Sequence, residues 1–294
     1  MSAARIRLGV AGWDYPDWDG VVYPGRRGRG FDRLAYLSGF VDVIEVNSTF
    51  YRPATPRVAE SWVRRTAARP DFRFTAKAHA SWTHEPGSDL EAAARETLDG
   101  LRPLRDAERL GALLLQFPQS FHFNPAARER LARLADLAAG WPAVVEVRHA
   151  SWAGDEAAAW LAAHELGWCA IDQPRIGAST LGLLPRVLGS VGYVRLHGRN
   201  AANWFREDAG RDARYDYLYA EAELAEIARP VLEMAASAAR VFVVQNNHFR
   251  GQALVNTLQL ARRLRAGRPP APRELVASYP ELAPIVRVEP AGLF

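Results

Sequence analysis

The chain has very little cysteine and no long apolar segment. Cys169 is the only cysteine among 294 residues, which excludes an internal disulfide and fits a reducing compartment. The amino-terminal stretch MSAARIRLGVAGW lacks the apolar region of a signal peptide. No run approaches the roughly 20 apolar residues that a membrane helix needs. These absences predict a cytoplasmic protein with no membrane partner.

Lysine is almost absent as well. The 37 basic side chains include a single lysine, Lys77, and all the others are arginines. Arginine stays charged at any ordinary pH, whereas a desolvated lysine can lose its proton and become a nucleophile or a base. Lys77 lies near the end of the strand-like run FRFTAKAH, so its position predicts a confined site in which a lysine has a specific chemical role. The net charge of +4 permits a polyanionic partner but does not require one.

Several local motifs are also missing. No GxGxxG follows the first strand-like run, and the chain contains no Walker loop, no GxSxG elbow and no HExxH. The missing glycine motif weighs against a doubly wound open sheet, which is the structural alternative considered next.

Strand-like apolar runs alternate with helical stretches rich in Ala, Leu, Arg and Glu along most of the chain. The runs cover residues 6–12, 41–47, 72–79, 111–117, 143–149, 168–172, 192–198 and 241–247. Eight such strands are the number that closes a parallel barrel, so we expect a single-domain TIM (β/α)8 barrel over residues 1–294. Its core is expected over about 5–265, followed by a proline-rich extension over 266–294.

Polar side chains gather where these strands end, often two residues apart and therefore on one face. They are Glu45, Asn47, Lys77, His79, Gln116, Glu146, Arg148, Asp172, Arg195, His197, Gln245 and Asn247. Any one of these residues, taken alone, is more often a member of a structural ion pair than a catalytic group. The whole set at one rim predicts a functional mouth, because buried charges are costly unless they pair.

Aromatic side chains follow the same strand ends. Five of the nine tryptophans fall in these loops: Trp13, Trp18, Trp82, Trp152 and Trp204. Such rings can stack on a ligand or simply cover the barrel with apolar mass. We expect Trp13, Tyr51 and Trp204 to line the opening.

Eight segments resemble one known family, in its order and over about residues 5–265. They are GWDYPDWDGVVYP, EVNSTFYRPAT, FTAKAHASWTHE, LGALLLQFPQSFHFN, VVEVRHASW, YVRLHGRNAANW, ARYDYLYAEAEL and VVQNNHFRGQALVN. The chain is similar to the domain-of-unknown-function 72, or YecE-like, family. The resemblance implies a TIM barrel with the topology of xylose isomerase and endonuclease IV, and it implies no particular reaction. Asp14 departs from the family pattern, in which a small hydroxyl residue is commoner.

A small anionic ligand, phosphorylated or sugar-like, is the partner that the strand ends favour. Lys77, Arg148 and Arg195 would bind or polarise it, since guanidinium groups grip two oxygens and an ammonium acts as a point charge. Glu45 and Glu146 would orient these bases or act as a general base, and His197 would transfer protons. The expected substrate-binding residues are Trp13, Asn47, Tyr51, Gln116, Asp172, Arg195, Trp204 and Asn247.

Three other hypotheses stay open at this point. A divalent metal on His79, Glu146, Asp172 and His197 is possible but not favoured, because nearby cations would crowd it; a metal-dependent phosphodiesterase belongs to this hypothesis. A Schiff base on Lys77 is weakened because Glu45 is expected to keep the amine protonated. Nucleic acid could bind the arginines at 26, 27, 29, 262, 263 and 265. Cofactor and oligomeric state stay unknown.

Overall fold

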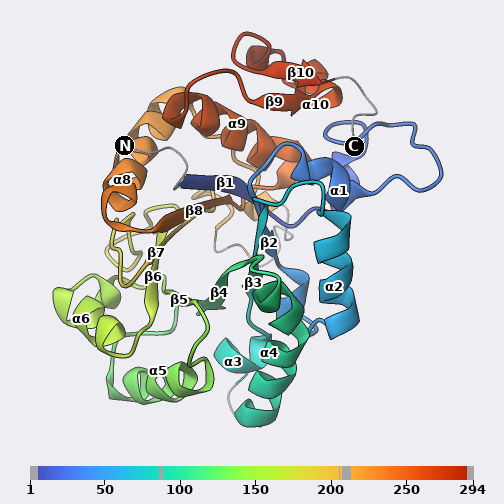
Figure 1. Cartoon of the computed structure of the whole chain (residues 1–294). Helices are drawn as coiled ribbons and strands as arrows, with labels where there is room; N and C mark the ends of the chain where they lie inside the picture. The colour runs from blue at the N-terminus through green and yellow to red at the C-terminus, as the bar shows by residue number, and fades with distance from the viewer. Residues whose placement is uncertain (1–5, 86–88, 205, 207–212, 290–294) are drawn as a thin grey trace.

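The computed structural model describes residues 6–85, 89–204, 206 and 213–289 and shows one closed barrel of eight parallel strands (Figure 1). The strands are β1 (Ile6–Ala11), β2 (Val43–Val46), β3 (Arg73–Lys77), β4 (Leu110–Gln116), β5 (Ala143–Glu146), β6 (Gly167–Asp172), β7 (Val191–Leu196) and β8 (Arg240–Gln245). Each strand pairs with its neighbours in sequence, and β8 pairs with β1. The predicted TIM barrel is therefore confirmed.

The barrel interior is filled by side chains of alternating residues. Tyr193 and Phe242 lie in it with their ring centroids 6.2 Å apart. Gly111 leaves the room that this packing needs, because a Cβ there would come within 2.4 Å of the Phe242 ring. Apolar residues thus close the lower part of the barrel, and polar side chains begin above them.

Helices surround the barrel, and several of them begin at capped turns. They are α1 (Arg33–Ser38), α2 (Pro56–Arg65), α3 (Ala80–Thr83), α4 (Leu90–Asp106), α5 (Pro125–Leu137), α6 (Asp155–Ala163), α8 (Glu221–Ser237) and α9 (Gln252–Leu264). The side chains of Thr55, Asp89 and Asn124 accept hydrogen bonds from the first turns of α2, α4 and α5. The connection from β6 to β7, residues 173–190, is fully described and contains no helix.

The carboxyl-terminal extension forms a small layer beside α9 (Figure 1). It contains β9 (Pro270–Pro272), α10 (Arg273–Ser278) and β10 (Arg287–Glu289), and the two strands pair in parallel. Leu275 and Leu282 are fully buried, and the Tyr279 hydroxyl donates a hydrogen bond to the carbonyl of Arg250. The extension was predicted to reach residue 294, and residues 290–294 lie outside the described part. Among the described helices, none is long and apolar enough to cross a membrane.

Candidate functional site

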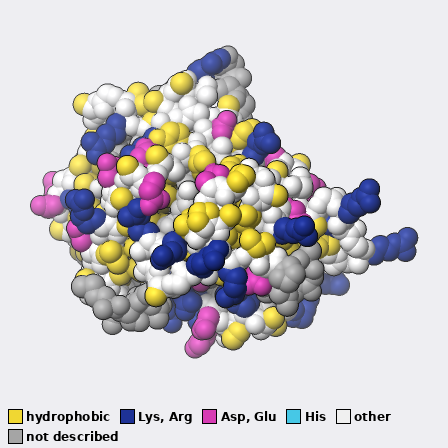
Figure 2. Space-filling model, turned by 90° about the horizontal axis from the view of Figure 1, so that it is seen from above, with side chains coloured by type: hydrophobic (Ala, Val, Ile, Leu, Met, Phe, Trp, Pro, Cys, Tyr) yellow, Lys and Arg dark blue, Asp and Glu magenta, His cyan; other side chains and the backbone are white. Residues whose placement is uncertain are grey.

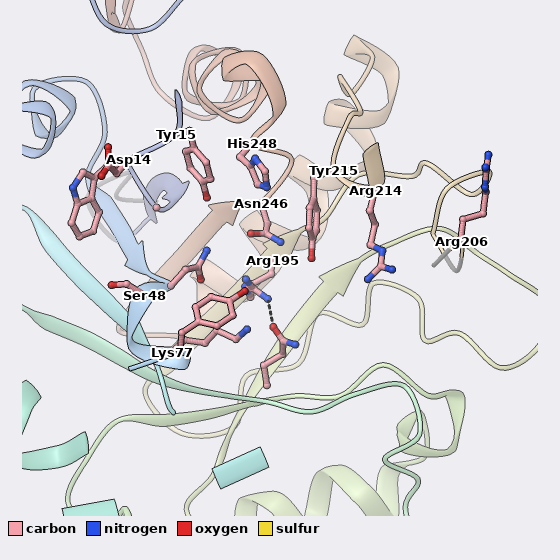
Figure 3. Close-up of a pocket in the computed structure, with 15 residues that line it drawn as sticks. Asp14, Tyr15, Ser48, Lys77, Arg195, Arg206, Arg214, Tyr215, Asn246 and His248 are labelled. Carbon is pink, nitrogen blue, oxygen red and sulfur yellow. Dashed lines mark hydrogen bonds between the residues drawn. The ribbon is translucent and has the colours of Figure 1, made fainter. Parts of the chain in front are cut away.

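A cavity of about 670 Å³ opens at the carboxyl ends of the barrel strands (Figure 3). This is the end at which TIM barrels place their chemistry. The lining comes from the loops after β1, β2, β7 and β8 and from the ends of β3, β4 and β7. The lining residues are Gly12, Trp13, Asp14, Tyr15, Asn47, Ser48, Tyr51, Lys77, Gln116, Arg195, Arg206, Arg214, Tyr215, Asn246 and His248.

Arg195 forms the floor of this cavity and is almost completely buried. Its guanidinium donates to Oε2 of Glu146 at 2.5 Å and to Oε1 of Glu45 at 2.7 Å. Nη1 also reaches Oε1 of Gln116 at 3.4 Å, the contact drawn in Figure 3. Burial lowers the pKa of Arg195, but the two carboxylates outweigh burial and raise it well above its ordinary value. Arg195 is therefore a permanent cation held in a fixed position.

Each of the two carboxylates has a second partner. Tyr193 donates its hydroxyl to Oε2 of Glu45 at 2.8 Å, and Thr75 shares a hydrogen bond with the same hydroxyl at 2.7 Å. Arg148 donates from Nε and Nη2 to Oε1 of Glu146 at 3.1 and 3.0 Å. Glu45 and Glu146 are fully buried, where an unpaired charge would be costly. The guanidinium groups of Arg195 and Arg148 balance their two negative charges.

Glu146 stays ionised in this setting. Burial raises the pKa of its carboxyl group, but Arg195, His197 and Arg148 together outweigh burial and hold it well below its ordinary value. A carboxylate with such a low pKa is a poor general base, because it binds protons weakly. We therefore regard Glu146 as a group that positions the two arginines.

His197 lies beside Glu146 and is fully buried. Its Nδ1 accepts a hydrogen bond from Nδ2 of Asn246 at 3.0 Å, which leaves the ring proton on Nε2. Nε2 lies 3.3 Å from Oε1 of Glu146, without the alignment of a hydrogen bond. Burial lowers the pKa of His197 to about 4 despite the neighbouring carboxylate. The ring is thus neutral at physiological pH, and it does not line the cavity.

Lys77 differs from the other charged groups because the described residues offer its amine no ion pair and no hydrogen bond. Its Nζ lies 3.8 Å from the centroid of the Phe50 ring, a cation–π contact. Burial lowers the pKa of Lys77 to about 7, and repulsion by Arg195 adds to this effect against the attraction of Glu146 and Glu45. Glu45 was expected to keep the amine protonated; its carboxylate is already paired with Arg195 and Tyr193, and its attraction does not outweigh burial.

Aromatic rings form the walls of the cavity. Trp13 packs edge-on against Trp62 with centroids 5.9 Å apart, and Tyr15 stacks on His248 at 4.4 Å. Tyr51 also lines the cavity, and its side chain is 69% exposed at the rim. Trp204 is placed differently from the expectation. It is buried against His197 and Arg148 and does not line the cavity.

Two expected binding residues, Asp172 and Asn247, lie outside the cavity. Asp172 accepts hydrogen bonds from Arg199 at 2.8 Å and from Tyr219 at 2.7 Å, on the outer side of the barrel. Asn247 donates to the carbonyl of Tyr217 and to Oδ1 of Asn256, both at 2.8 Å.

The register of the sheet explains both placements. Asp172 and Gln245 each pair with Leu196, which points outward because its neighbours Arg195 and His197 point inward. The inward position after β8 is therefore Asn246, which lines the cavity and holds His197.

The four residues considered for a metal do not gather. His79 caps the first turn of α3 through Nδ1, which bonds Ser81, and Asp172 lies outside the barrel. Within the described ranges there is no group of three or more His, Cys, Asp or Glu side chains that could hold a metal ion.

Surface arginines do not form one continuous basic face in the view of Figure 2, where acidic and apolar side chains lie between them. Arg27 pairs with Asp19 at 2.6 Å, Arg265 pairs with Asp42 at 2.5 Å, and Arg263 pairs with Glu221.

Nine of the fifteen lining residues were not predicted as site residues, and four of them, which belong to recognisable segments, illustrate the reason. Ser48 lies in EVNSTF, Arg214 and Tyr215 lie in ARYDYLY, and His248 ends VVQNNH. These segments are loops after strands, where the alternation of a strand no longer says which side chain points inward. Figure 3 shows Arg214 and Tyr215 reaching the cavity from the segment after β7.

Comparisons with known proteins agree on one family. The family model described as "Protein of unknown function DUF72" matches residues 7–277. The UPF0759 protein YunF of Bacillus subtilis (strain 168) is 29% identical over 273 residues, which cover 87% of this chain and 93% of that protein.

Solved structures give the same picture. A DUF72 family protein from Thermotoga maritima MSB8 is 32% identical with a TM-score of 0.76, over 88% of this chain and 98% of that one. A DUF72 family protein from Enterococcus faecalis V583 is 24% identical with a TM-score of 0.78, over 88% and 95% of the two chains, and supports the fold alone.

Proposed function

Because the chain belongs to the DUF72 family, whose description names no activity, we propose its function from the site itself: an enzyme that acts on a small anionic compound in the barrel mouth. The compound is phosphorylated or sugar-like. It enters the cavity between the aromatic walls and meets Lys77 and Arg195 at the floor.

The distribution of charge in the cavity carries this proposal. Its lining contains four basic residues, Lys77, Arg195, Arg206 and Arg214, against a single carboxylate, that of Asp14. That carboxylate pairs with Arg33. The carboxylates beneath the floor are already balanced by Arg195 and Arg148. A bound anion would therefore meet net positive charge from the other basic side chains of the lining, Lys77 and Arg214 among them, and their donors can bind its oxygens.

Catalysis, rather than binding alone, is supported by the state of Lys77. An amine whose pKa is lowered to about 7 is present in both protonation states near neutral pH. Groups tuned in this way are suited to proton transfer or nucleophilic attack, and they cluster at active sites. Asn47 adds a buried Oδ1 that has no hydrogen-bond partner among the described residues and can accept a hydrogen bond from a ligand hydroxyl.

Calorimetric titration with ribose 5-phosphate, ribose and inorganic phosphate tests the proposal. We expect the phosphate ester to bind and free ribose to bind at least about ten-fold more weakly, as expected for loss of charge-assisted hydrogen bonds. Arg214→Gln should weaken the binding of ribose 5-phosphate by about ten-fold. Arg133→Gln on the exposed face of α5 is the matched control and should leave binding unchanged.

Equal binding of ribose and ribose 5-phosphate would contradict the anionic substrate. Retention of single-stranded DNA at moderate salt, unaffected by Arg214→Gln, would favour a nucleic-acid surface instead.

A further inference from the structure

We infer that Lys77 forms a covalent imine with the carbonyl carbon of its substrate, so that the substrate is an anionic aldehyde or ketone. The inference rests on the proposed function and narrows it: the anionic group fixes the compound in the cavity, and the carbonyl group meets the amine at its floor. The geometry around Nζ, the pairing of the neighbouring charges and the place of Lys77 and Arg195 in the cavity lining support it.

The surroundings of Nζ can accommodate an imine. An ammonium group carries three donors, and among the described residues no acceptor forms a hydrogen bond with Nζ. A protonated imine carries a single N–H and spreads its charge over carbon and nitrogen. The face of the Phe50 ring, 3.8 Å from Nζ, stabilises such a cation without needing any hydrogen bond.

The neighbouring carboxylates leave the amine without a counterion. Glu45 is paired with Arg195 and Tyr193, and Glu146 is paired with Arg195 and Arg148. The two guanidinium groups also repel a third cation. Lys77 is therefore the group in this cluster that can give up its proton, and the free amine carries the electron pair that nucleophilic attack requires.

The step balances without any added reagent. The lone pair of Nζ attacks the carbonyl carbon, and the π electrons move to the oxygen, which takes up a proton lost by the nitrogen. The hydroxyl of the resulting carbinolamine takes up a proton from solvent and leaves as water while the lone pair of nitrogen forms the C=N bond. The nitrogen keeps its remaining hydrogen, and the product is the iminium ion. Arg195 lines the same cavity, so its fixed positive charge stabilises the developing negative charge on oxygen.

The single lysine makes the test unusually clean, because Lys77 and the α-amino group are the only aliphatic amines of the chain. The probe is pyridoxal 5′-phosphate, an aldehyde that carries a phosphate group, and pyridoxal without the phosphate is the comparison. Each is incubated with the whole protein at pH 7 and reduced with borohydride. Intact mass and peptide mapping then locate the adduct, and the α-amino group serves as the internal reference.

We expect the ratio of Lys77 labelling to α-amino labelling to be at least about ten-fold higher with the phosphorylated aldehyde than with pyridoxal, with saturation and with competition by inorganic phosphate at Lys77. The rate should reach half its maximum near pH 7, where the amine loses its proton. In urea the preference for Lys77 over the α-amino group should disappear. Labelling of the α-amino group alone, or the same ratio of Lys77 to α-amino labelling for the two aldehydes, would overturn the inference.

Two variants separate the covalent role from the charge. Lys77→Arg keeps a cation that cannot form an imine, so it should lose the adduct and keep binding of ribose 5-phosphate within about three-fold. Lys77→Met should lose the adduct as well. If ribose 5-phosphate binds to the native protein but no aldehyde is trapped at Lys77, the imine is refuted and the anion site stands. If neither occurs, both proposals fail.

Discussion

Replacing Lys77 by methionine should make the protein more stable and should do so most strongly at low pH. Methionine has a similar length and fills the same space, but it needs no water and no counterion. The folded protein therefore no longer has to desolvate an amine beside Arg195. The added stability comes at the expense of the reactive group, as is common at active sites.

The magnitude follows from the pKa of Lys77. Burial lowers this pKa from the ordinary value of 10.5 to about 7. At a pH below 7, where the amine is protonated in both the folded and the unfolded protein, the shift corresponds to a loss of roughly 5 kcal/mol of folding stability. That figure is an upper limit, because the side chain is only partly buried. Between pH 7 and 10.5 the folded protein releases this proton while the unfolded chain keeps it. The unfolded chain then binds more protons, so the penalty shrinks as the pH rises.

Urea unfolding at pH 6.5 and pH 8.5 measures this difference. Lys77→Met should have a higher free energy of unfolding than the native protein at pH 6.5, and its advantage should fall by about 2 kcal/mol at pH 8.5. Arg133→Met on the surface of α5 is the control, whose effect should be the same at both pH values. An effect of Lys77→Met that does not change with pH would refute a desolvated amine at the barrel mouth.

Two further predictions concern the groups beneath the cavity. Glu146→Gln should lower the free energy of unfolding by about 3–5 kcal/mol, because Arg195 and Arg148 lose the carboxylate with which both are paired. Chemical denaturation measures this change, and a loss below about 1 kcal/mol would contradict the pairing. His197 should stay neutral with its proton on Nε2 down to about pH 5, which nitrogen chemical shifts of the histidine rings report directly; protonation near pH 6.5 would show that burial does not control this ring.

The barrel was predictable because its strands are buried on both faces. A strand such as β4, LGALLLQ, has no polar side chain until its last residue, and runs of this kind alternating with helical stretches are typical of a parallel sheet. The boundaries were less predictable. The run over 143–149 forms a strand only as far as Glu146, since the chain leaves the sheet before Arg148.

Two-sided burial is also the reason that parts of the site were misplaced. Alternation correctly put Glu45, Arg195 and His197 on the inner face, because each lies next to apolar residues that face the helices. In β6 and β8 both faces are apolar, so the sequence does not show which of the two alternating sets of residues points into the barrel. Cys169 pairs with the inward Tyr193, and Asp172 three residues later therefore points outward.

The protonation state of Lys77 depends on which ion pairs the neighbouring carboxylates form, and a single sequence does not show these pairs. Acids and bases at adjacent strand ends predict a network, but which carboxylate joins which base depends on side-chain geometry inside the barrel. Once Glu45 and Glu146 are paired with Arg195 and Arg148, the charges cancel and the lysine is left over. An arginine at this position would remain charged at any ordinary pH and would supply no free amine. In a chain whose other basic side chains are all arginines, the one lysine therefore lies where the ability to lose a proton changes what the site can do.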